Sequence, residues 1–173
     1  MKSRSGYLGS RLACCAAAAV LGTLGVPSIS AAQTEPPPTF ARGEACKDFA
    51  LDLSGVGGNQ VFREFFDRNG NRVRWLSAGK GTVLTFTNMT TGEDLTIKTG
   101  GSVTHGTDNP DGSQTWTSTG HNVWILFDSD VPAGPSTTLY LGRVVFNFNP
   151  QTGFTQLLTD KGAQKIDICA ALS

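Results

Sequence analysis

The chain has 173 residues, which leaves room for one ordinary domain after its first 32 residues are set aside. Those 32 residues hold three of the 14 basic side chains and none of the 14 acidic ones, so the remainder carries 11 basic against 14 acidic groups. Because no run of basic residues survives in that remainder, the sequence argues against nucleic acid or an anionic membrane as a partner.

The first 32 residues have the order of a secretory signal peptide. A basic start is followed by an uncharged apolar run at 12–26 and by small residues up to Ala32. The run has 15 residues, fewer than the roughly 18 needed to span a bilayer. We therefore expect cleavage after Ala32 and a secreted, extracellular protein without a membrane span. Two rival interpretations are an uncleaved anchor and a lipidated Cys14.

Two cysteines remain after the leader, Cys46 and Cys169. In an exported chain such a pair predicts a disulfide, with free thiols or a metal pair as the alternative. Residues 33–45 contain three consecutive prolines and few apolar side chains, which predicts a flexible tether. The folded domain is expected to cover 46–173.

Apolar and polar residues alternate with a period of two through the domain, so we predict β-strands and no helix. Asn69-Gly70 lies between two such segments and marks a tight hairpin turn. The expected strands are 49–53, 60–67, 72–77, 81–88, 94–99, 114–119, 121–127, 137–148, 154–159 and 164–169, and 102–105 is a candidate for a further short strand.

Sequential hairpins of this kind predict an all-β fold, an antiparallel up-and-down meander. A disulfide between Cys46 and Cys169 would place the first and last strands side by side. The favoured architecture is therefore a barrel of eight to ten strands, with a two-sheet β-sandwich as the alternative.

Some strands show which of their faces should be covered. In 121–127 and in 137–148 apolar side chains occupy both faces, so both segments are expected at the centre of the domain. In 114–119 threonine occupies every second position, which is typical of a sheet surface facing solvent.

Candidate metal ligands are few. Asp67, Asn69 and Asn71 match the first three ligands of a calcium loop, but Arg72 and Ala78 stand where that loop needs glycine and glutamate. A plain hairpin turn is the better interpretation, and no metal or cofactor is predicted.

The two histidines, His105 and His121, lack further zinc ligands at suitable spacing. Asp128 and Asp130 could serve as an acid and a base, but two aspartates in one loop more often cap turns.

Two charged residues stand among apolar neighbours. Glu64 shares a strand face with Phe62 and Phe66, and Arg143 lies inside the most apolar run. A charge on an apolar face requires a partner or a wet cavity. Each is therefore either an outward or ion-paired side chain or a polar contact in a ligand cavity. The candidate ligand-binding residues are Glu64, Trp75, His121, Trp124, Tyr140 and Arg143.

The domain resembles a family of short exported actinobacterial proteins with no assigned activity. The features that carry the resemblance are the two terminal cysteines, Asp67-Arg68-Asn69-Gly70, Gly120-His121 and the run 138–145. The predicted meander also looks like lipocalin-type and allene-oxide-cyclase-type barrels, although the Gly-x-Trp signature of lipocalins is absent. The resemblance implies an architecture and no catalytic residues.

Three functions are compatible with these patterns. The first is a non-enzymatic barrel that binds a small, partly apolar molecule in its interior. The second is a structural or surface module with a filled core that contacts an extracellular protein. The third is a small isomerase or hydrolase that uses His121 with Asp128 or Glu64.

Overall fold

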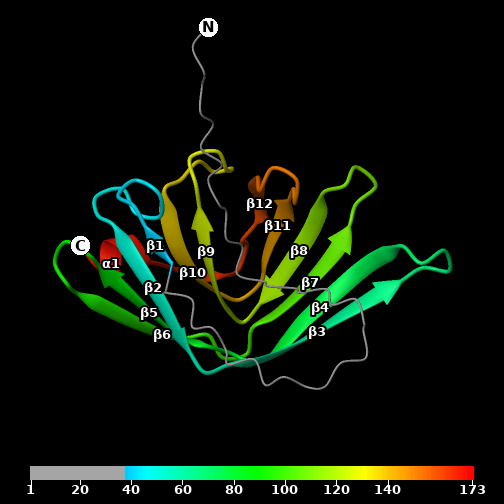
Figure 1. Cartoon of the computed structure of the whole chain (residues 1–173), viewed down its shortest axis with the longest axis horizontal. Coiled ribbons are helices and arrows are strands. Elements are labelled where there is room, and N and C mark those ends of the chain that lie inside the picture. The colour runs from blue at the N-terminus through cyan, green and yellow to red at the C-terminus, as the bar shows by residue number, and fades with distance from the viewer. Residues whose placement is uncertain (1–37) are drawn as a thin grey trace, which may run out of the picture. The chain divides into compact units, whose positions relative to one another are not determined.

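A computed structural model describes residues 38–173 as an all-β domain with antiparallel sheets (Figure 1). The predicted signal peptide, 1–32, lies outside the described residues, as does the start of the predicted tether. The strands form three sheets. Every pairing between named strands is antiparallel.

The four-stranded sheet has the order β1-β2-β5-β6. Its strands are β1 (Thr39–Phe40), β2 (Leu51–Val56), β5 (Val83–Asn88) and β6 (Asp94–Lys98). The three-stranded sheet has the order β13-β10-β9. Its strands are β9 (His121–Leu126), β10 (Ser136–Leu141) and β13 (Gln164–Asp167).

The six-stranded sheet has the order β12-β11-β8-β7-β4-β3. Its strands are β3 (Asn59–Phe66), β4 (Arg72–Lys80), β7 (Val103–Asp108), β8 (Gln114–Thr119), β11 (Val144–Phe148) and β12 (Thr155–Thr159). In Figure 1, β4, β7 and β8 run side by side and β3 forms the outer edge of this sheet.

The predicted barrel is wrong, because no sheet closes on itself. The hairpin predicted around Asn69-Gly70 is present as β3 and β4. The strands between hairpins do not pair in sequence, since β2 pairs with β5 and β4 with β7. A sandwich-like packing of sheets describes the domain better.

One long bent hairpin explains why the sheets stay open. Strands β8 and β9 pair with β11 and β10 in a single continuous register, from Gln114 opposite Phe148 to Leu126 opposite Ser136. The pair bends where Gly120, at φ +85°, and Gly142, at φ +134°, face each other. The amide of Gly142 donates to the carbonyl of Gly120 at 3.0 Å. Glycine tolerates these positive φ values, and the bend sends each strand from one sheet into another.

The bend makes the three-stranded sheet the middle layer. Leu139 on its outer side belongs to a core with Phe86 of the four-stranded sheet. Tyr140 on its inner side belongs to a second core with Phe146 of the six-stranded sheet. The prediction that 121–127 and 137–148 are covered on both faces is confirmed, although Gly142 divides the second run into β10 and β11.

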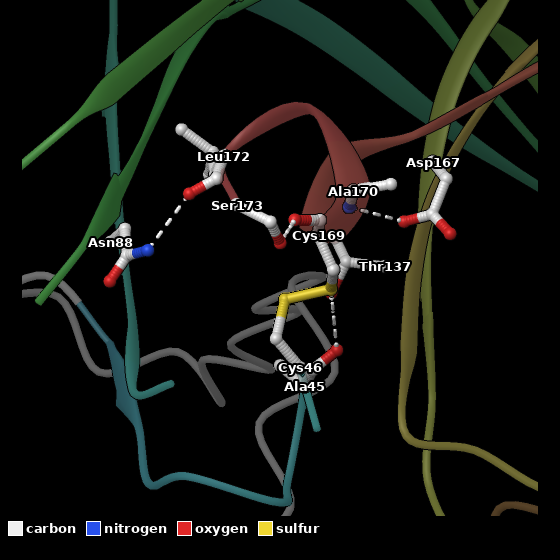
Figure 2. The surroundings of a disulfide bond; sticks show 9 residues. All are labelled: Ala45, Cys46, Asn88, Thr137, Asp167, Cys169, Ala170, Leu172 and Ser173. Atoms are coloured by element: carbon white, nitrogen blue, oxygen red, sulfur yellow. Dashed lines mark hydrogen bonds between the residues drawn. A yellow bond between two sulfur atoms is a disulfide. The ribbon is translucent and has the colours of Figure 1, made fainter. Parts of the chain in front are cut away.

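The predicted disulfide between Cys46 and Cys169 is confirmed, with Cα atoms 5.6 Å apart across 123 positions of sequence. Figure 2 shows that it joins the segment before β2 to α1 (Ile168–Ala171). The expectation that it pairs the first and last strands is wrong, since β13 pairs with β10. In the described part of the chain no helix is long and apolar enough to cross a membrane.

The side chains around the disulfide fix α1 against its neighbours (Figure 2). The Asn88 side chain donates to the carbonyl of Leu172 at 2.8 Å, and the Thr137 hydroxyl donates to the carbonyl of Ala45 at 2.9 Å. Asp167 caps the helix by accepting from the amide of Ala170 at 3.0 Å. These contacts replace part of the strand predicted at 164–169 with a helical turn.

The domain begins earlier than the sequence analysis expected. Thr39 and Phe40 pair with β2, and Phe40 packs against the first core. Ala45 is fully buried in that core. Residues 38–45 are therefore part of the fold, because an aromatic ring and a buried alanine hold them there.

Candidate functional site

An unbroken series of aromatic side chains crosses one face of the six-stranded sheet and continues into the bend. We call it the aromatic row. Neighbouring ring centroids lie 3.9–6.1 Å apart. In order, the row contains Phe62, Trp75, Trp116, Trp124, Phe146 and Tyr140. Each such ring pair adds about 0.5–1.5 kcal/mol to the burial of its area, so the row is a rigid structure.

Strand register places the row on one face. Trp75 lies opposite Gly106 on β7, and Gly106 lies opposite Trp116 on β8. A Cβ atom on Gly106 would overlap Cε2 and Nε1 of Trp75. The missing side chain therefore leaves the space through which the indole of Trp75 reaches across β7 to Trp116, 5.2 Å away between centroids.

The row is exposed chiefly at its outer end, and Trp75, next to that end, is only 5% exposed. Tyr140 and Phe146 are buried at its inner end, where desolvation raises the pKa of the Tyr140 phenol. Trp116 and Trp124 are partly buried. Phe62 at the outer end, on the edge strand β3, is 44% exposed. The outer end of the row is therefore where a partner molecule has access to it.

A chain of polar side chains runs beside the row on the same face, and we call it the polar network. Arg72 donates to Glu64 at 2.9 Å and to both carboxylate oxygens of Asp108 at 2.9 and 3.0 Å. Gln114 donates to Asp108 at 2.7 Å and accepts from the indole N–H of Trp116 at 2.7 Å. The network links β3, β4, β7 and β8 and ends on the aromatic row.

Charge pairing fixes the ionisation of the polar network. The hydrogen bonds from Arg72 lower the pKa of Asp108, against the opposing effect of its burial. The same bonds, to Asp108 first and to Glu64 second, raise the pKa of the Arg72 guanidinium. Arg72 and Asp108 therefore stay charged near neutral pH, and the guanidinium of Arg72 is occupied by carboxylates of its own chain.

The structure separates the six predicted ligand-binding residues. Trp75, Trp124 and Tyr140 belong to the aromatic row, and Glu64 belongs to the polar network. His121 lies elsewhere, with Nδ1 2.9 Å from the carbonyl of Gly100.

Arg143 does not line an interior cavity. It follows the glycine bend and is exposed, so its side chain faces away from the core that its neighbours enter. The interpretation of Glu64 as one partner of a structural ion pair agrees with its 2.9 Å bond to Arg72.

The pairing of His121 with Asp128, considered from sequence as a catalytic arrangement, is not assembled. His121 begins β9 and Asp128 follows the end of that strand, so about 20 Å of extended backbone separates them. Asp130 is buried, and its two oxygens accept from the amides of Phe127 at 2.7 Å and Thr155 at 2.8 Å. Asp130 therefore fixes its loop to β12, the turn-capping role that the sequence favoured.

The Asp67 turn is a hairpin turn. One carboxylate oxygen of Asp67 accepts from the amides of Asn69 and Asn71 at 2.8 and 2.9 Å. These bonds, chiefly the one from Asn71, lower the pKa of Asp67. Among the described residues no group of three or more His, Cys, Asp or Glu side chains is placed to hold a metal ion.

A hollow of about 270 Å³ lies beside the disulfide, at some remove from the aromatic row. Lys47, Asp48 and Asp167 are among its lining residues, and none of the aromatic row lines it. This hollow is therefore not the cavity lined by tryptophan and tyrosine that a ligand-binding barrel requires.

Three important residues were absent from the candidates chosen by sequence. Trp116 connects the row to the polar network, Gly106 makes room for Trp75, and Arg72 joins the carboxylates. A glycine inside a strand often marks the close approach of another group, so Gly106 carried a usable signal. Arg72 was considered only as a mismatch in a calcium loop.

No protein-family model matches the chain, and neither a curated protein nor a solved structure is similar to it. The function of the domain is therefore inferred from the geometry of the site.

Proposed function

We propose that this domain is an exported, non-enzymatic binding module that engages its partner on the open face and edge of the six-stranded sheet. The binding surface is the hairpin of β3 and β4, residues 59–80, at the outer end of the aromatic row. A disulfide is typical of an oxidising, extracellular compartment, which fits such a role.

One observation carries the proposal: the hairpin exposes apolar side chains on a supported base. Four large apolar residues on it are 41–58% exposed, namely Val61, Phe62, Phe66 and Val73. Phe62 and Phe66 share one face of β3, whereas Val61 lies on the opposite face. Exposed apolar groups gathered on one face mark interaction sites more often than scattered ones do. The aromatic row and the polar network hold the base of this surface in one geometry, which lowers the entropy lost on binding.

The interior of the domain supports a surface site over a cavity site. Phe86, Phe146, Leu51, Ile168 and Leu172 are the largest fully buried side chains, and they fill the two cores. In the described residues every buried side-chain nitrogen or oxygen has a hydrogen-bond partner. A filled core with an exposed apolar surface is what the second function considered from sequence requires.

A second candidate is the binding of a small, partly apolar molecule on the same face. Trp116 and Phe148 are both partly exposed, and their rings lie 4.7 Å apart beside Gln114. Flat apolar groups with polar edges suit such a surface. A small molecule that stays bound through purification and is detected by native mass spectrometry would favour this candidate.

An apolar fluorescent probe tests the binding surface. We expect anilinonaphthalene sulfonate to brighten when it is mixed with the unchanged protein. A Phe62→Ser, Phe66→Ser double variant should reduce that brightening several-fold, because it removes the two exposed rings of β3.

The matched control carries Met89→Ser and Ile166→Ser, which remove apolar side chains that are 55% and 44% exposed on other parts of the domain. This variant should bind the probe as the unchanged protein does. Circular dichroism must show that both variants are folded. Equal probe binding by the two folded variants would contradict the proposed surface.

A further inference from the structure

Strand β3 is an unpaired sheet edge of unusual length for this domain. It has eight residues, seven of them exposed, and among the described residues it pairs only with β4. The other strands that end a sheet, β1, β6, β9, β12 and β13, have two to six residues. The backbone N–H and C=O groups along the free edge of a strand can pair with a further strand.

The hairpin is also the basic part of an otherwise acidic domain. Residues 59–80 hold five basic and two acidic side chains, whereas the rest of 38–173 holds six basic and eleven acidic ones. Among the described residues, Arg63, Arg68 and Lys80 have no carboxylate within ion-pair distance. These cations are spread along the hairpin, with Arg68 in its turn and Lys80 at its open end.

The two faces of the β3 edge differ in chemistry. Phe62 and Phe66 lie on the face of the aromatic row, where Glu64 between them is already paired with Arg72. Arg63 lies on the opposite face. Next to Arg63 on that face, Arg74 of β4 sits over the ring of Phe65 at 4.2 Å. A strand added to this edge would meet Phe62 and Phe66 on one face, and on the other face it would meet Arg63 between Val61 and Phe65.

From these features we infer that β3 accepts an extended acidic segment of a partner protein as a seventh strand of the sheet. Main-chain hydrogen bonds supply affinity in such pairing, and alternate side chains supply specificity. The segment would alternate apolar residues, placed against Phe62 and Phe66, with carboxylates placed against Arg63. The inference rests on the proposed function and names its partner.

Charge argues against a second copy as the occupant. Antiparallel pairing of two β3 strands would bring two hairpins together, each with five basic and two acidic side chains. Like charges facing each other across a strand pair are destabilising. With an acidic partner, the charges that face each other across the strand pair are opposite, and the interaction is attractive.

A synthetic peptide tests the inference with the protein expressed from the full sequence. The probe is a blocked eight-residue peptide of alternating glutamate and valine, equal in length to β3. We expect it to bind and to slow hydrogen exchange of backbone amides in β3. A lysine–valine peptide should bind at least tenfold more weakly. A glutamate–valine peptide with alternate amides N-methylated should not protect β3, because it cannot form the ladder.

Charge variants of the protein give the matching control. Arg63→Glu with Arg68→Glu should weaken binding of the glutamate–valine peptide at least tenfold. Lys98→Glu with Lys161→Glu changes the net charge equally at exposed sites outside the hairpin, and it should leave binding unchanged.

The outcomes separate this inference from the proposed function. Absence of peptide binding, or binding without protection of β3, overturns the strand-pairing inference. If the apolar probe still depends on Phe62 and Phe66 in that case, the proposed surface stands. Binding of the hairpin to phosphatidylglycerol vesicles in place of the peptide would also overturn it, in favour of a membrane surface. Loss of both peptide and probe binding overturns both.

Discussion

Gly106 shows how one missing side chain organises the binding face. It stands in the middle of β7, where a side chain would occupy the position of the Trp75 indole. With hydrogen at this position, Trp75 lies across the strand and contacts Trp116, and the row continues from β4 to β8. Gly106 thus helps to hold the exposed hairpin in place, although it is not itself part of the proposed binding surface.

Gly106→Ala should therefore destabilise the domain by about 1–3 kcal/mol, the usual cost of adding a methyl group to a closely packed site. Urea unfolding would measure the loss, and the tryptophan emission should shift because the indole of Trp75 is displaced. Gly100→Ala is the control, since no heavy atom lies within 4 Å of a Cβ at Gly100. Equal stability of the two variants would show that Trp75 does not need the space at Gly106.

At the scale of elements, the polar network adds side-chain links between four strands that already pair through their backbones. Asp108, at the end of β7, accepts hydrogen bonds from Nε and Nη2 of Arg72 on β4 and from the side-chain amide of Gln114 on β8. Glu64 on β3 holds the remaining nitrogen of Arg72. The edge hairpin is thus tied to the centre of the sheet by charge-assisted hydrogen bonds, which are stronger than neutral ones.

The lowered pKa of Asp108 makes this tie dependent on pH. A carboxyl group whose pKa is lower in the folded than in the unfolded state, about 3.9, stabilises the fold above that value. This stabilisation is lost as the pH falls through the folded pKa. Asp108→Asn should lower the free energy of unfolding at pH 7 by on the order of 1 kcal/mol and should reduce its decline between about pH 5 and pH 2.

Urea unfolding at several pH values would measure this difference. The control is Asp128→Asn, which removes the same charge from an exposed loop. Its free energy of unfolding is expected to vary with pH as that of the unchanged protein does. Parallel pH profiles for the unchanged protein and Asp108→Asn would contradict the role of the network.

At the scale of the whole molecule, the strands could be predicted from sequence but their arrangement could not. The period-two pattern located most strands and the two segments with apolar side chains on both faces, and the cysteine pair predicted the disulfide. It continues without interruption through Gly142, where the chain turns into another sheet. The alternation of apolar and polar residues shows only which side chains share a face of a strand. A bend at two paired glycines leaves that alternation unchanged, so the pattern does not reveal the bend.

The candidate site was predicted only in part for a related reason. Trp75, Trp124 and Tyr140 were chosen as large amphipathic side chains, and they do lie in one row. Arg143 could be either an outward side chain or a polar contact in a cavity, and the structure has it exposed directly after the bend at Gly142. The basic excess of the hairpin lies within one segment, residues 59–80, and it is easily overlooked because no two of its five basic side chains are adjacent.

Photo-crosslinking in the cells that produce the protein tests the central claim most directly. A benzoylphenylalanine replaces Phe66 on the hairpin in one variant and Ile166 of β13, also exposed, in another. The account predicts a discrete adduct of higher mass from position 66 and none from position 166. Adducts of the same kind from both positions, or none from position 66, would contradict the claim that this hairpin is the binding surface.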